Sequence, residues 1–382
     1  MNEPSSGAPR TASASPGPIA EPGSASIACP AVSADHGVTE TTSDPGAVLV
    51  TGLCGFIGSH LAAALLDQGA TVIGVDTQPL ENAGRTAFLL RQLSDYSRFE
   101  FLRASVEDPK VTRALDRASA VVHLAAATDI ASSWKAGFTE HASSVLSAQR
   151  LLWACGRAGV PRVLVASSSH VYGPGGGGLA REDASVEPTS PYGVAKLAVE
   201  RLALAYARRP GSSMSAVALR LFTAFGPGCK PEMVVPRMFD AAQAGRPMPL
   251  FGDGTAPHSW TYVTDLVDAT IRAIRIPLEA GHAQVVNAAG PDTASLRQVA
   301  DVVGELVGRP VRLEPAGERP GDAIGTCADL TWARQLLGFT PRIGLREGLL
   351  RQWEHLNTPP PAAPPVNRQL SRPTERQQEA RS

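Results

Sequence analysis

The stretch Val48-Leu49-Val50-Thr51-Gly52-Leu53-Cys54-Gly55-Phe56-Ile57-Gly58-Ser59-His60 joins an apolar, β-branched run to a helical pattern. Its three glycines remove side chains where the chain turns tightly, where backbone approaches a pyrophosphate, and where helix packs on strand. The start of the following helix offers N–H groups and a partial positive charge to those phosphates. This strand–turn–helix setting predicts a dinucleotide site at Gly52, Gly55 and Gly58, with an ordinary glycine turn as the alternative.

Asp76 ends the next β-branched segment, 18 residues after Gly58. A carboxylate at this place suits the two hydroxyls of an adenosine ribose and repels a 2′-phosphate. The residues that follow it, Thr77-Gln78-Pro79, include no arginine. The sequence therefore favours NAD over NADP as the cofactor.

Short β-branched segments alternate with longer helical patterns downstream of the glycines. The segments are Ala47–Thr51, Thr71–Asp76, Phe99–Arg103, Ala120–Ala125, Arg162–Ser167 and Ala216–Leu221. This alternation predicts an α/β fold, a doubly wound parallel sheet with helices on both faces. Past Gly226 the pattern becomes irregular. We predict a nucleotide-binding domain over residues 46–226, with some later segments returning to it, and a smaller region mainly for substrate binding over 227–356.

The flanks and the overall composition exclude several classes of partner. Residues 1–45 and 357–382 lack an apolar period, which predicts a disordered leader and tail. The chain is 43% hydrophobic and 19% charged with a formal net charge of −1, so it has no general attraction to nucleic acid or acidic membranes. No apolar run reaches the ~18 residues of a membrane span, and no secretory signal pattern opens the chain. We expect neither a nucleic-acid nor a membrane partner.

The cysteines are odd in number and scattered: Cys29, Cys54, Cys155, Cys229 and Cys327. They form no Cys-x-x-Cys pair, which argues against a disulfide framework and against a zinc site. We therefore expect no metal and a cytoplasmic protein.

Tyr192 and Lys196 stand four residues apart in Ser190-Pro191-Tyr192-Gly193-Val194-Ala195-Lys196. On a helix this spacing places both side chains on one face. A neighbouring ammonium favours the phenolate, so we expect the pKa of Tyr192 to lie below its usual value of about 10. Such a tyrosine can take a proton from a sugar or alcohol hydroxyl as hydride leaves the carbon. The alternative is an exposed helical face.

Further stretches match one family in their order and spacing. They are Val122–Ala126, Ala166–Gly173, Leu219–Pro227, Trp260–Asp265 and Arg319–Asp322. With the glycine loop and the Tyr192 stretch, they make the chain resemble the extended short-chain dehydrogenase/reductases, specifically their nucleotide-sugar epimerases and dehydratases. The resemblance runs from about Ala47 to His355 and implies a Rossmann-type domain, bound NAD and a homodimer.

The resemblance also implies roles for individual residues. Ser168 would hydrogen-bond the reacting hydroxyl, Tyr192 would act as base and then as acid, and Lys196 would hold ribose hydroxyls. The serine run stands at the C-terminal end of a predicted strand, where open α/β sheets present groups to ligands, although ordinary turn chemistry also explains it. Additional cofactor contacts are expected from Phe56, Ile57, Leu124, Ala125 and Ala126.

Two residues after Ser168 indicate the reaction. Dehydratases of this family carry an Asp-Glu pair there, whereas this chain has Ser169 and His170. The acid/base pair for 4,6-dehydration is therefore missing. His170 could titrate near neutrality, but we expect it to pack against a loop wall. We expect a 4-epimerase that transiently oxidises C4 of a UDP-hexuronate or UDP-hexose. A 4-ketosugar reductase or a decarboxylase on the same scaffold, and a non-catalytic NAD-binding protein, are the alternatives.

The expected substrate contacts are Ser169, His170, Thr223, Lys230, Arg237, His258 and Arg319. Thr223 and Lys230 resemble the stretch that holds the C6 carboxylate in UDP-glucuronate 4-epimerases, where the cation is Arg. Lysine keeps the charge but gives up bidentate geometry. His258 replaces the family's diphosphate-binding Arg. Ser105 and Ser144 replace an adenine-facing Asp and an Asn near the nicotinamide.

Overall fold

The computed structural model describes residues 46–80, 84–135, 138–174, 178–318, 321 and 325–358 of the 382-residue chain. The predicted leader over 1–45 lies outside these described residues. The predicted tail over 357–382 lies outside them as well, apart from its first two residues.

A seven-stranded, fully parallel sheet forms the centre, as the alternating segments predicted. In spatial order its strands are β11 (Ala283–Ala288), β7 (Ser215–Leu221), β5 (Arg162–Ser168), β4 (Ala118–His123), β1 (Ala47–Thr51), β2 (Val72–Asp76) and β3 (Phe99–Arg103). The order of strand addition reverses between β1 and β4. In open α/β sheets, ligands bind beyond the strand ends at such a reversal.

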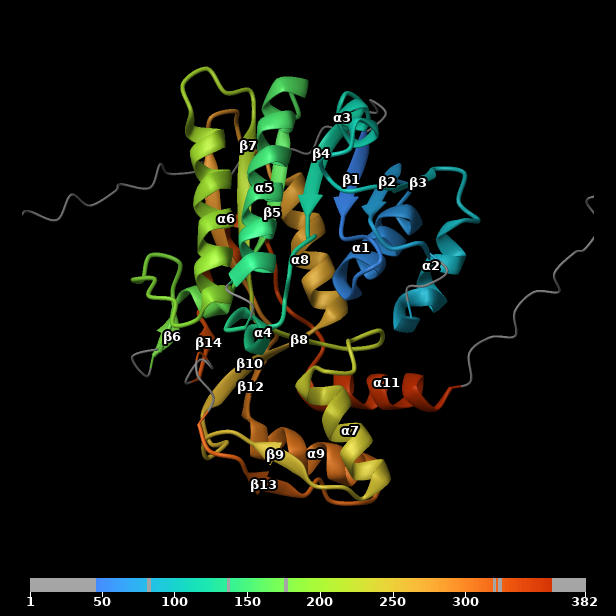
Figure 1. Cartoon of the computed structure of the whole chain (residues 1–382), viewed down its shortest axis with the longest axis vertical. Coiled ribbons are helices and arrows are strands. Elements are labelled where there is room, and N and C mark those ends of the chain that lie inside the picture. The colour runs from blue at the N-terminus through green and yellow to red at the C-terminus, as the bar shows by residue number, and fades with distance from the viewer. Residues whose placement is uncertain are drawn as a thin grey trace, which may run out of the picture. The chain divides into compact units, whose positions relative to one another are not determined.

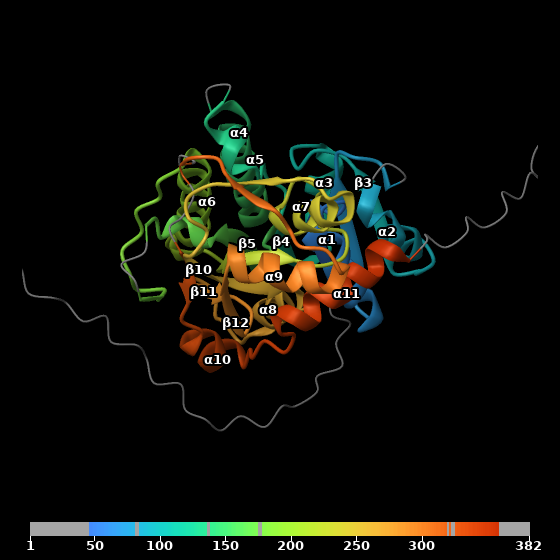
Figure 2. The ribbon, with the colours of Figure 1, turned by 90° about the horizontal axis from the view of Figure 1, so that it is seen from below.

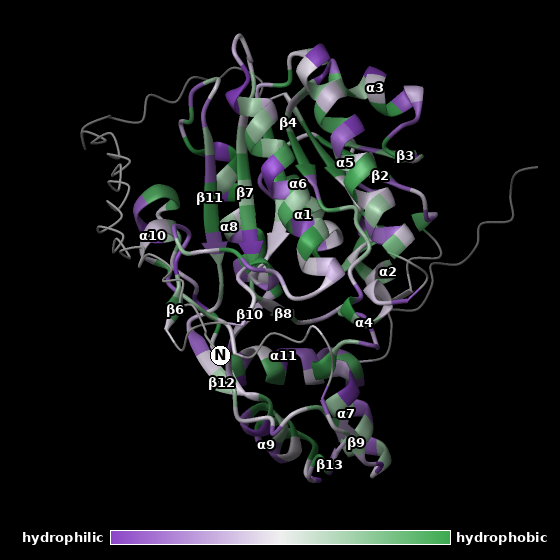
Figure 3. Ribbon diagram, turned by 60° about the vertical axis from the view of Figure 1, so that its left-hand side comes forward, coloured by the Kyte–Doolittle hydropathy of each residue, from purple (hydrophilic) through white to green (hydrophobic). Residues whose placement is uncertain are grey.

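Helices cover both faces of this sheet because successive strand side chains point to opposite sides. On β1, Val48 and Val50 join one buried core, whereas Ala47 and Leu49 join the other. The first core includes side chains from α1 (Phe56–Asp67), α2 (Ala87–Leu93), α8 (Val263–Arg275) and α10 (Thr331–Leu337). The second includes side chains from α3 (Pro109–Leu115), α5 (Thr139–Ala158) and α6 (Pro191–Arg208). Figure 3 shows β4, β7 and β11 largely hydrophobic along their length, as strands buried on both faces are.

A smaller region lies beyond the C-terminal ends of the strands (Figure 1). Its sheet consists of β8 (Thr223–Phe225), β10 (Pro257–Tyr262) and β12 (Asp292–Ser295). The short pairs are β9 (Met248–Leu250) with β13 (Leu313–Pro315), and β6 (Leu179–Ala180) with β14 (Cys327–Ala328). Its helices are α7 (Val234–Ala244), α9 (Leu296–Val307) and α11 (Leu345–Asn357), and α9 packs against both of the others (Figure 2). They share a third buried core with β10.

The region past Gly226 also returns to the central sheet, because β11 pairs with β7 along its whole length. Part of the chain after residue 226 thus belongs to the central sheet. The assignment of residues 227–356 mainly to substrate binding remains a prediction. None of the helices in the described ranges combines the length and apolarity that crossing a membrane requires.

Candidate active site

The glycine loop turns from β1 into α1 in a geometry that only glycine allows. Gly52 has a φ of +72°, and a Cβ there would lie 2.8 Å from the backbone N of Ala125. A Cβ on Gly58 would lie 2.2 Å from the carbonyl oxygen of Gly52. Gly55 is the N-cap of α1, and no side chain caps this helix. Its first backbone N–H groups therefore remain available to an anionic group.

Asp76 stands beside this loop at the end of β2. One carboxylate oxygen accepts the backbone N–H of Cys54 at 2.9 Å, and the other accepts that of Gln78 at 2.9 Å. These bonds fix the carboxylate next to the turn, at the strand end where the sequence places an adenosine ribose.

Ser168, Tyr192 and Lys196 come together at the ends of β5 and α6. Helix α6 begins here because Pro191 occupies its first turn and the hydroxyl of Ser190 accepts the N–H of Gly193 at 3.1 Å. Ser168 forms a hydrogen bond with Tyr192. Nζ of Lys196 lies 5.9 Å from the centroid of the Tyr192 ring. The three groups thus lie close together at one end of the sheet.

The prediction that Lys196 lowers the pKa of Tyr192 is wrong. Burial raises the pKa of Tyr192 above its usual value, and the hydrogen bond with Ser168 opposes that rise without cancelling it. Burial also lowers the pKa of Lys196 to about 8. Its Nζ donates to the carbonyl oxygen of Ala166 at 3.2 Å. Desolvation, which the sequence does not show, is the largest influence on the pKa of Tyr192.

Three histidines in or near the Tyr192 site have lowered pKa values. Burial, with a smaller contribution from the charge of Lys196, lowers the pKa of His123 to about 4. His170 places its ring edge-on against Tyr192 at 5.6 Å between centroids. Burial, and to a lesser degree the charge of His258, lowers the pKa of His170 to about 4. Burial also lowers the pKa of His258. His170 is therefore uncharged at pH 7 and does not titrate near neutrality.

The smaller region brings several of the predicted substrate contacts towards the same strand ends. Thr223 opens β8 and pairs with Trp260 of β10, the strand that carries His258. Nζ of Lys230, an exposed side chain, donates to Oγ1 of Thr128 at 3.2 Å, just beyond the end of β4.

The remaining predicted substrate contacts are Ser169, Arg237 and Arg319. Ser169 is buried directly after Ser168. Arg237 is half-buried on α7, and no contact ties it to the Tyr192 site. Arg319 lies outside the described residues.

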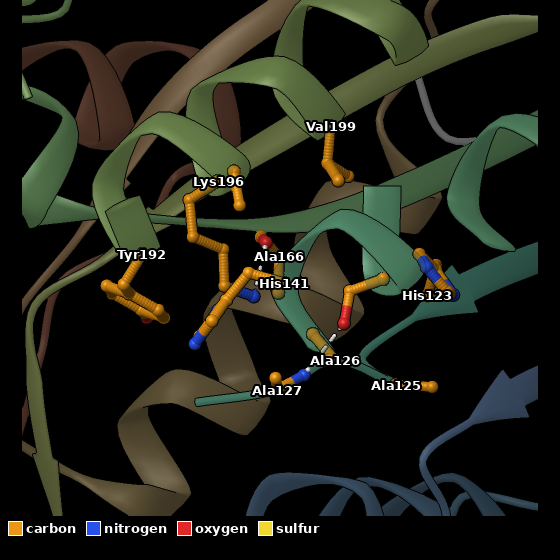
Figure 4. Close-up of a pocket in the computed structure, with 11 residues that line it drawn as sticks. His123, Ala125, Ala126, Ala127, His141, Ala166, Tyr192, Lys196 and Val199 are labelled. Carbon is orange, nitrogen blue, oxygen red and sulfur yellow. Dashed lines mark hydrogen bonds between the residues drawn. The ribbon is translucent and has the colours of Figure 1, made fainter. Parts of the chain in front are cut away.

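A pocket at the ends of β4 and β5 brings together residues predicted to bind the cofactor and residues predicted to act in catalysis (Figure 4). Of the predicted cofactor contacts, Ala125 and Ala126 line it together with Tyr192 and Lys196. The backbone N–H of Leu124 donates to the carbonyl oxygen of Thr51 at 3.2 Å, which joins the end of β4 to the glycine loop. Phe56 and Ile57 form the first turn of α1.

Helix α5 completes this pocket with His141 and Ser144. Sequence reasoning noted Ser144 as a departure from the family but missed His141. No spacing or motif singles out that histidine, and its place becomes visible only once α5 is packed against α6.

These residues fit a dinucleotide such as NAD. The glycine positions leave space that any Cβ would fill, and the uncapped start of α1 suits a pyrophosphate. The strand order reverses between β1 and β4. Asp76 lies on one side of this point, and the pocket that contains Lys196 lies on the other. A ligand that crosses this reversal can reach both ends.

Comparison with known proteins agrees with this geometry. A sequence profile described as the NAD dependent epimerase/dehydratase family matches residues 48–289. An uncharacterized UDP-glucose epimerase, YtcB of Bacillus subtilis, is 34% identical over 81% of this chain and 98% of its own length. Some dTDP-glucose 4,6-dehydratases match as well.

Two solved structures are also similar. MoeE5 in complex with UDP-glucuronic acid and NAD is 40% identical, with a TM-score of 0.74 over 81% of this chain and 99% of its own. The UDP-glucuronic acid 4-epimerase from Bacillus cereus, in complex with UDP-glucuronic acid and NAD, is 31% identical. Its TM-score is 0.75, over 81% of this chain and 98% of its own.

Proposed function

Because this chain belongs to the NAD dependent epimerase/dehydratase family, we propose that it is a nucleotide-sugar 4-epimerase that acts on a UDP-hexuronate or UDP-hexose. The observation that carries the proposal is the placement of Tyr192 and Lys196 in one pocket at the ends of β4 and β5, with Ser168 hydrogen-bonded to Tyr192. The similar structures with bound UDP-sugar and NAD support the same substrate class.

The residues divide the chemistry at C4 between them. When bound, NAD supplies the acceptor for the C4 hydride and its donor on return. Ser168 orients the 4-hydroxyl by hydrogen bonding, and Tyr192 takes its proton and later restores it. Lys196, beside Tyr192 in the same pocket, holds ribose hydroxyls. Oxidation and reduction cancel, so the net reaction is an isomerisation.

Ser169 and His170 favour epimerisation over dehydration. Elimination of water needs one group that protonates the leaving oxygen and another that removes a carbon-bound proton. The side chain of Ser169 is a buried hydroxyl, and His170, with a pKa of about 4, carries no proton to give at pH 7. Neither residue provides the acid.

The smaller region supports a nucleotide diphosphate and a C6 carboxylate as recognition elements. Lys230 reaches across to Thr128 at the rim of the strand ends, where it can meet a carboxylate. His258 stands close enough to His170 for their charges to interact, so it can face the diphosphate beside the sugar. Thr223 and Arg237 are the remaining described groups that we assign to the substrate, and Arg319 completes the set.

The test uses four substrates and two readouts. The purified protein is incubated separately with UDP-glucuronate, UDP-galacturonate, UDP-glucose and UDP-galactose, and the products are separated by chromatography. We expect a 4-epimer from at least one pair, with no change in absorbance at 340 nm. In a separate incubation with NADH and a UDP-4-ketosugar, stoichiometric consumption of NADH would instead identify a ketosugar reductase. Loss of CO₂ from a UDP-hexuronate would identify a decarboxylase. Absence of any product would leave the non-catalytic alternative.

We also infer a homodimer that forms through α5 and α6 and works in the cytoplasm. Leu146 and Trp153 of α5 and Val194 of α6 are exposed to 56%, 51% and 48% although they are large and apolar. A second copy would cover such a surface. Analytical ultracentrifugation of the wild type and of Trp153→Glu tests this, with a monomeric variant as the expected result.

A further inference from the structure

His141, in the first turn of α5, contains a buried atom without a partner. The side chain is only 2% exposed. Among the buried side-chain nitrogens and oxygens in the described part of the chain, Nε2 of His141 is the one that makes no hydrogen bond. Folded proteins rarely leave such atoms unpaired, because burial strips their water without replacing it. An unpaired atom that faces a pocket therefore indicates a ligand.

The imidazole faces the catalytic pocket. Its ring lies edge-on to Tyr192, with 6.0 Å between centroids and an interplanar angle of 82°. Phe138 stacks on it at 6.2 Å and 11°, which holds the ring in this orientation. Figure 4 shows the side chain reaching from α5 towards Tyr192, next to Lys196.

Neighbouring polar groups already have partners. Lys196 donates to the carbonyl oxygen of Ala166. Ser144, three residues after His141 on α5, donates its hydroxyl to a backbone carbonyl of its own helix and accepts the N–H of Ala127 at 3.0 Å. The Ser144 side chain is therefore tied to the protein, and the contact that α5 can offer a ligand falls to His141.

The position of the pocket determines which part of a ligand it meets. A dinucleotide crosses a doubly wound sheet at the reversal of strand order, here between β1 and β4. Asp76, at the end of β2, marks the adenosine half. The pocket at the ends of β4 and β5 lies on the opposite side of the reversal, so it receives the other half of the dinucleotide.

We propose that Nε2 of His141 hydrogen-bonds the nicotinamide nucleoside of NAD, as a cofactor-binding residue beside Lys196. One ring nitrogen of a neutral imidazole donates and the other accepts, so His141 can pair with a ribose hydroxyl or with the carboxamide. The proposal rests on the NAD-dependent function proposed above.

The experiment compares two nucleotides. NADH carries the nicotinamide nucleoside and ADP does not, so only NADH can contact His141. Dissociation constants for NADH are measured by its fluorescence, and those for ADP by competition with NADH. We expect His141→Phe to raise the dissociation constant for NADH about tenfold and to leave that for ADP unchanged.

Three further variants and one measurement complete the design. His141→Gln restores a polar atom and should bind NADH nearly as the wild type does. His282→Phe, the same change at an exposed histidine, should have no effect. The melting temperature of His141→Phe without nucleotide should equal or exceed that of the wild type, because an unpaired buried atom is removed. His141→Leu replaces the phenylalanine variant if that protein does not fold.

The outcomes separate this proposal from the proposed function. Unchanged NADH affinity in His141→Phe, or equal losses for NADH and ADP, would overturn the role of His141 alone. A wild type that binds no NADH would overturn the NAD-dependent function and this proposal with it.

Discussion

Strand β5 and helix α6 together build two polar clusters that differ in how they are completed. Ser167 and Ser168 follow one another on β5, and Lys196 and Glu200 lie one turn apart on α6. Ser167 donates to Glu200 at 2.7 Å, and Arg220 of β7 pairs with the same carboxylate at 2.8 Å. Lys196 instead lines the pocket with Tyr192, and Ser168 hydrogen-bonds Tyr192.

The first cluster, which we call the closed cluster, is completed by the protein itself. Glu200 and Arg220 are almost fully buried and bonded twice to each other. Arg220 also lies over the ring of Tyr172 at 4.7 Å, and the Tyr172 hydroxyl donates to Asn287 of β11 at 2.7 Å. Because it leaves no group for a ligand, we assign it to the scaffold.

The second cluster, the open cluster, consists of Ser168, Tyr192, Lys196 and His141. It contains a phenol whose pKa is raised, an ammonium whose pKa is lowered, and an unpaired imidazole nitrogen. Unpaired or poorly solvated groups cost stability, and a protein retains them where a ligand completes them. Incomplete hydrogen bonding, more than burial or polarity, therefore distinguishes the open cluster from the closed cluster.

Breaking the closed cluster should have the largest effect. Glu200→Ala leaves Arg220 charged, buried and unpaired, and we expect a loss of about 3–5 kcal/mol in the free energy of unfolding. Urea unfolding measures it. The double variant Glu200→Leu/Arg220→Met should lose less than the single one, because no charge remains unpaired. Equal or greater loss in the double variant would contradict this interpretation.

Breaking the open cluster should remove activity without loss of stability. Tyr192→Phe should lower kcat roughly 10³-fold, or about 4 kcal/mol, the size of a general acid–base contribution. Its free energy of unfolding should change by less than ~1 kcal/mol. The control is Tyr206→Phe on the same helix, whose hydroxyl accepts a hydrogen bond from Gln149. An active Tyr192→Phe protein would rule out Tyr192 as the base.

Acid should weaken the fold through the histidine beside the open cluster. The pKa of His123 is about 4 in the folded protein, below its usual value near 6.5. As the pH falls from 6.5 to 4, His123 becomes protonated in the unfolded chain but stays neutral in the folded chain. Stability is therefore lost in this window, by up to about 3 kcal/mol from this residue.

Urea unfolding between pH 4 and 7 measures the loss. His123→Asn should reduce the pH slope by up to about 1.4 kcal/mol per pH unit, the value for one proton. Identical slopes for the two proteins would show that His123 does not cause the effect.

The two serines provide the smallest and sharpest test, because they are adjacent. Ser167→Ala should cost about 1–3 kcal/mol of stability, since it removes a buried hydrogen bond to a charged group. Ser168→Ala should instead lower kcat by roughly 10- to 100-fold, a loss of about 1–3 kcal/mol in transition-state stabilisation. Parallel unfolding and epimerase assays compare them. If both variants lost the same stability and the same activity, the distinction between the two clusters would be contradicted.

Local sequence predicted most of the fold. The six predicted strands all occur within two residues of their expected ends, because β-branched runs between glycine and helical signals are local features. The glycine loop, the Asp76 position and the Tyr192 helix are local as well. Strand β11 was not identified individually, since its place beside β7 depends on pairing between distant parts of the chain.

The site was less accessible to sequence reasoning for two physical reasons. The pKa of Tyr192 depends on burial, which the Tyr-x-x-x-Lys spacing does not reveal. His141 and Arg220 have their partners on other elements, which no local pattern in the sequence shows. Geometry of this kind arises only when helices pack onto the sheet.

The pairing of β11 with β7 affects how the protein is made. Residues 283–288 leave the ribosome more than sixty residues after β7 ends at Leu221. Until then β7 is an uncovered edge strand, and such edges promote aggregation. Asn287 hydrogen-bonds Tyr172 and the carbonyl oxygen of Ala180, and it is synthesised only with β11. A fragment that stops at Gly226 should therefore form inclusion bodies on expression, whereas a chain that ends after α11 should be recovered in the supernatant.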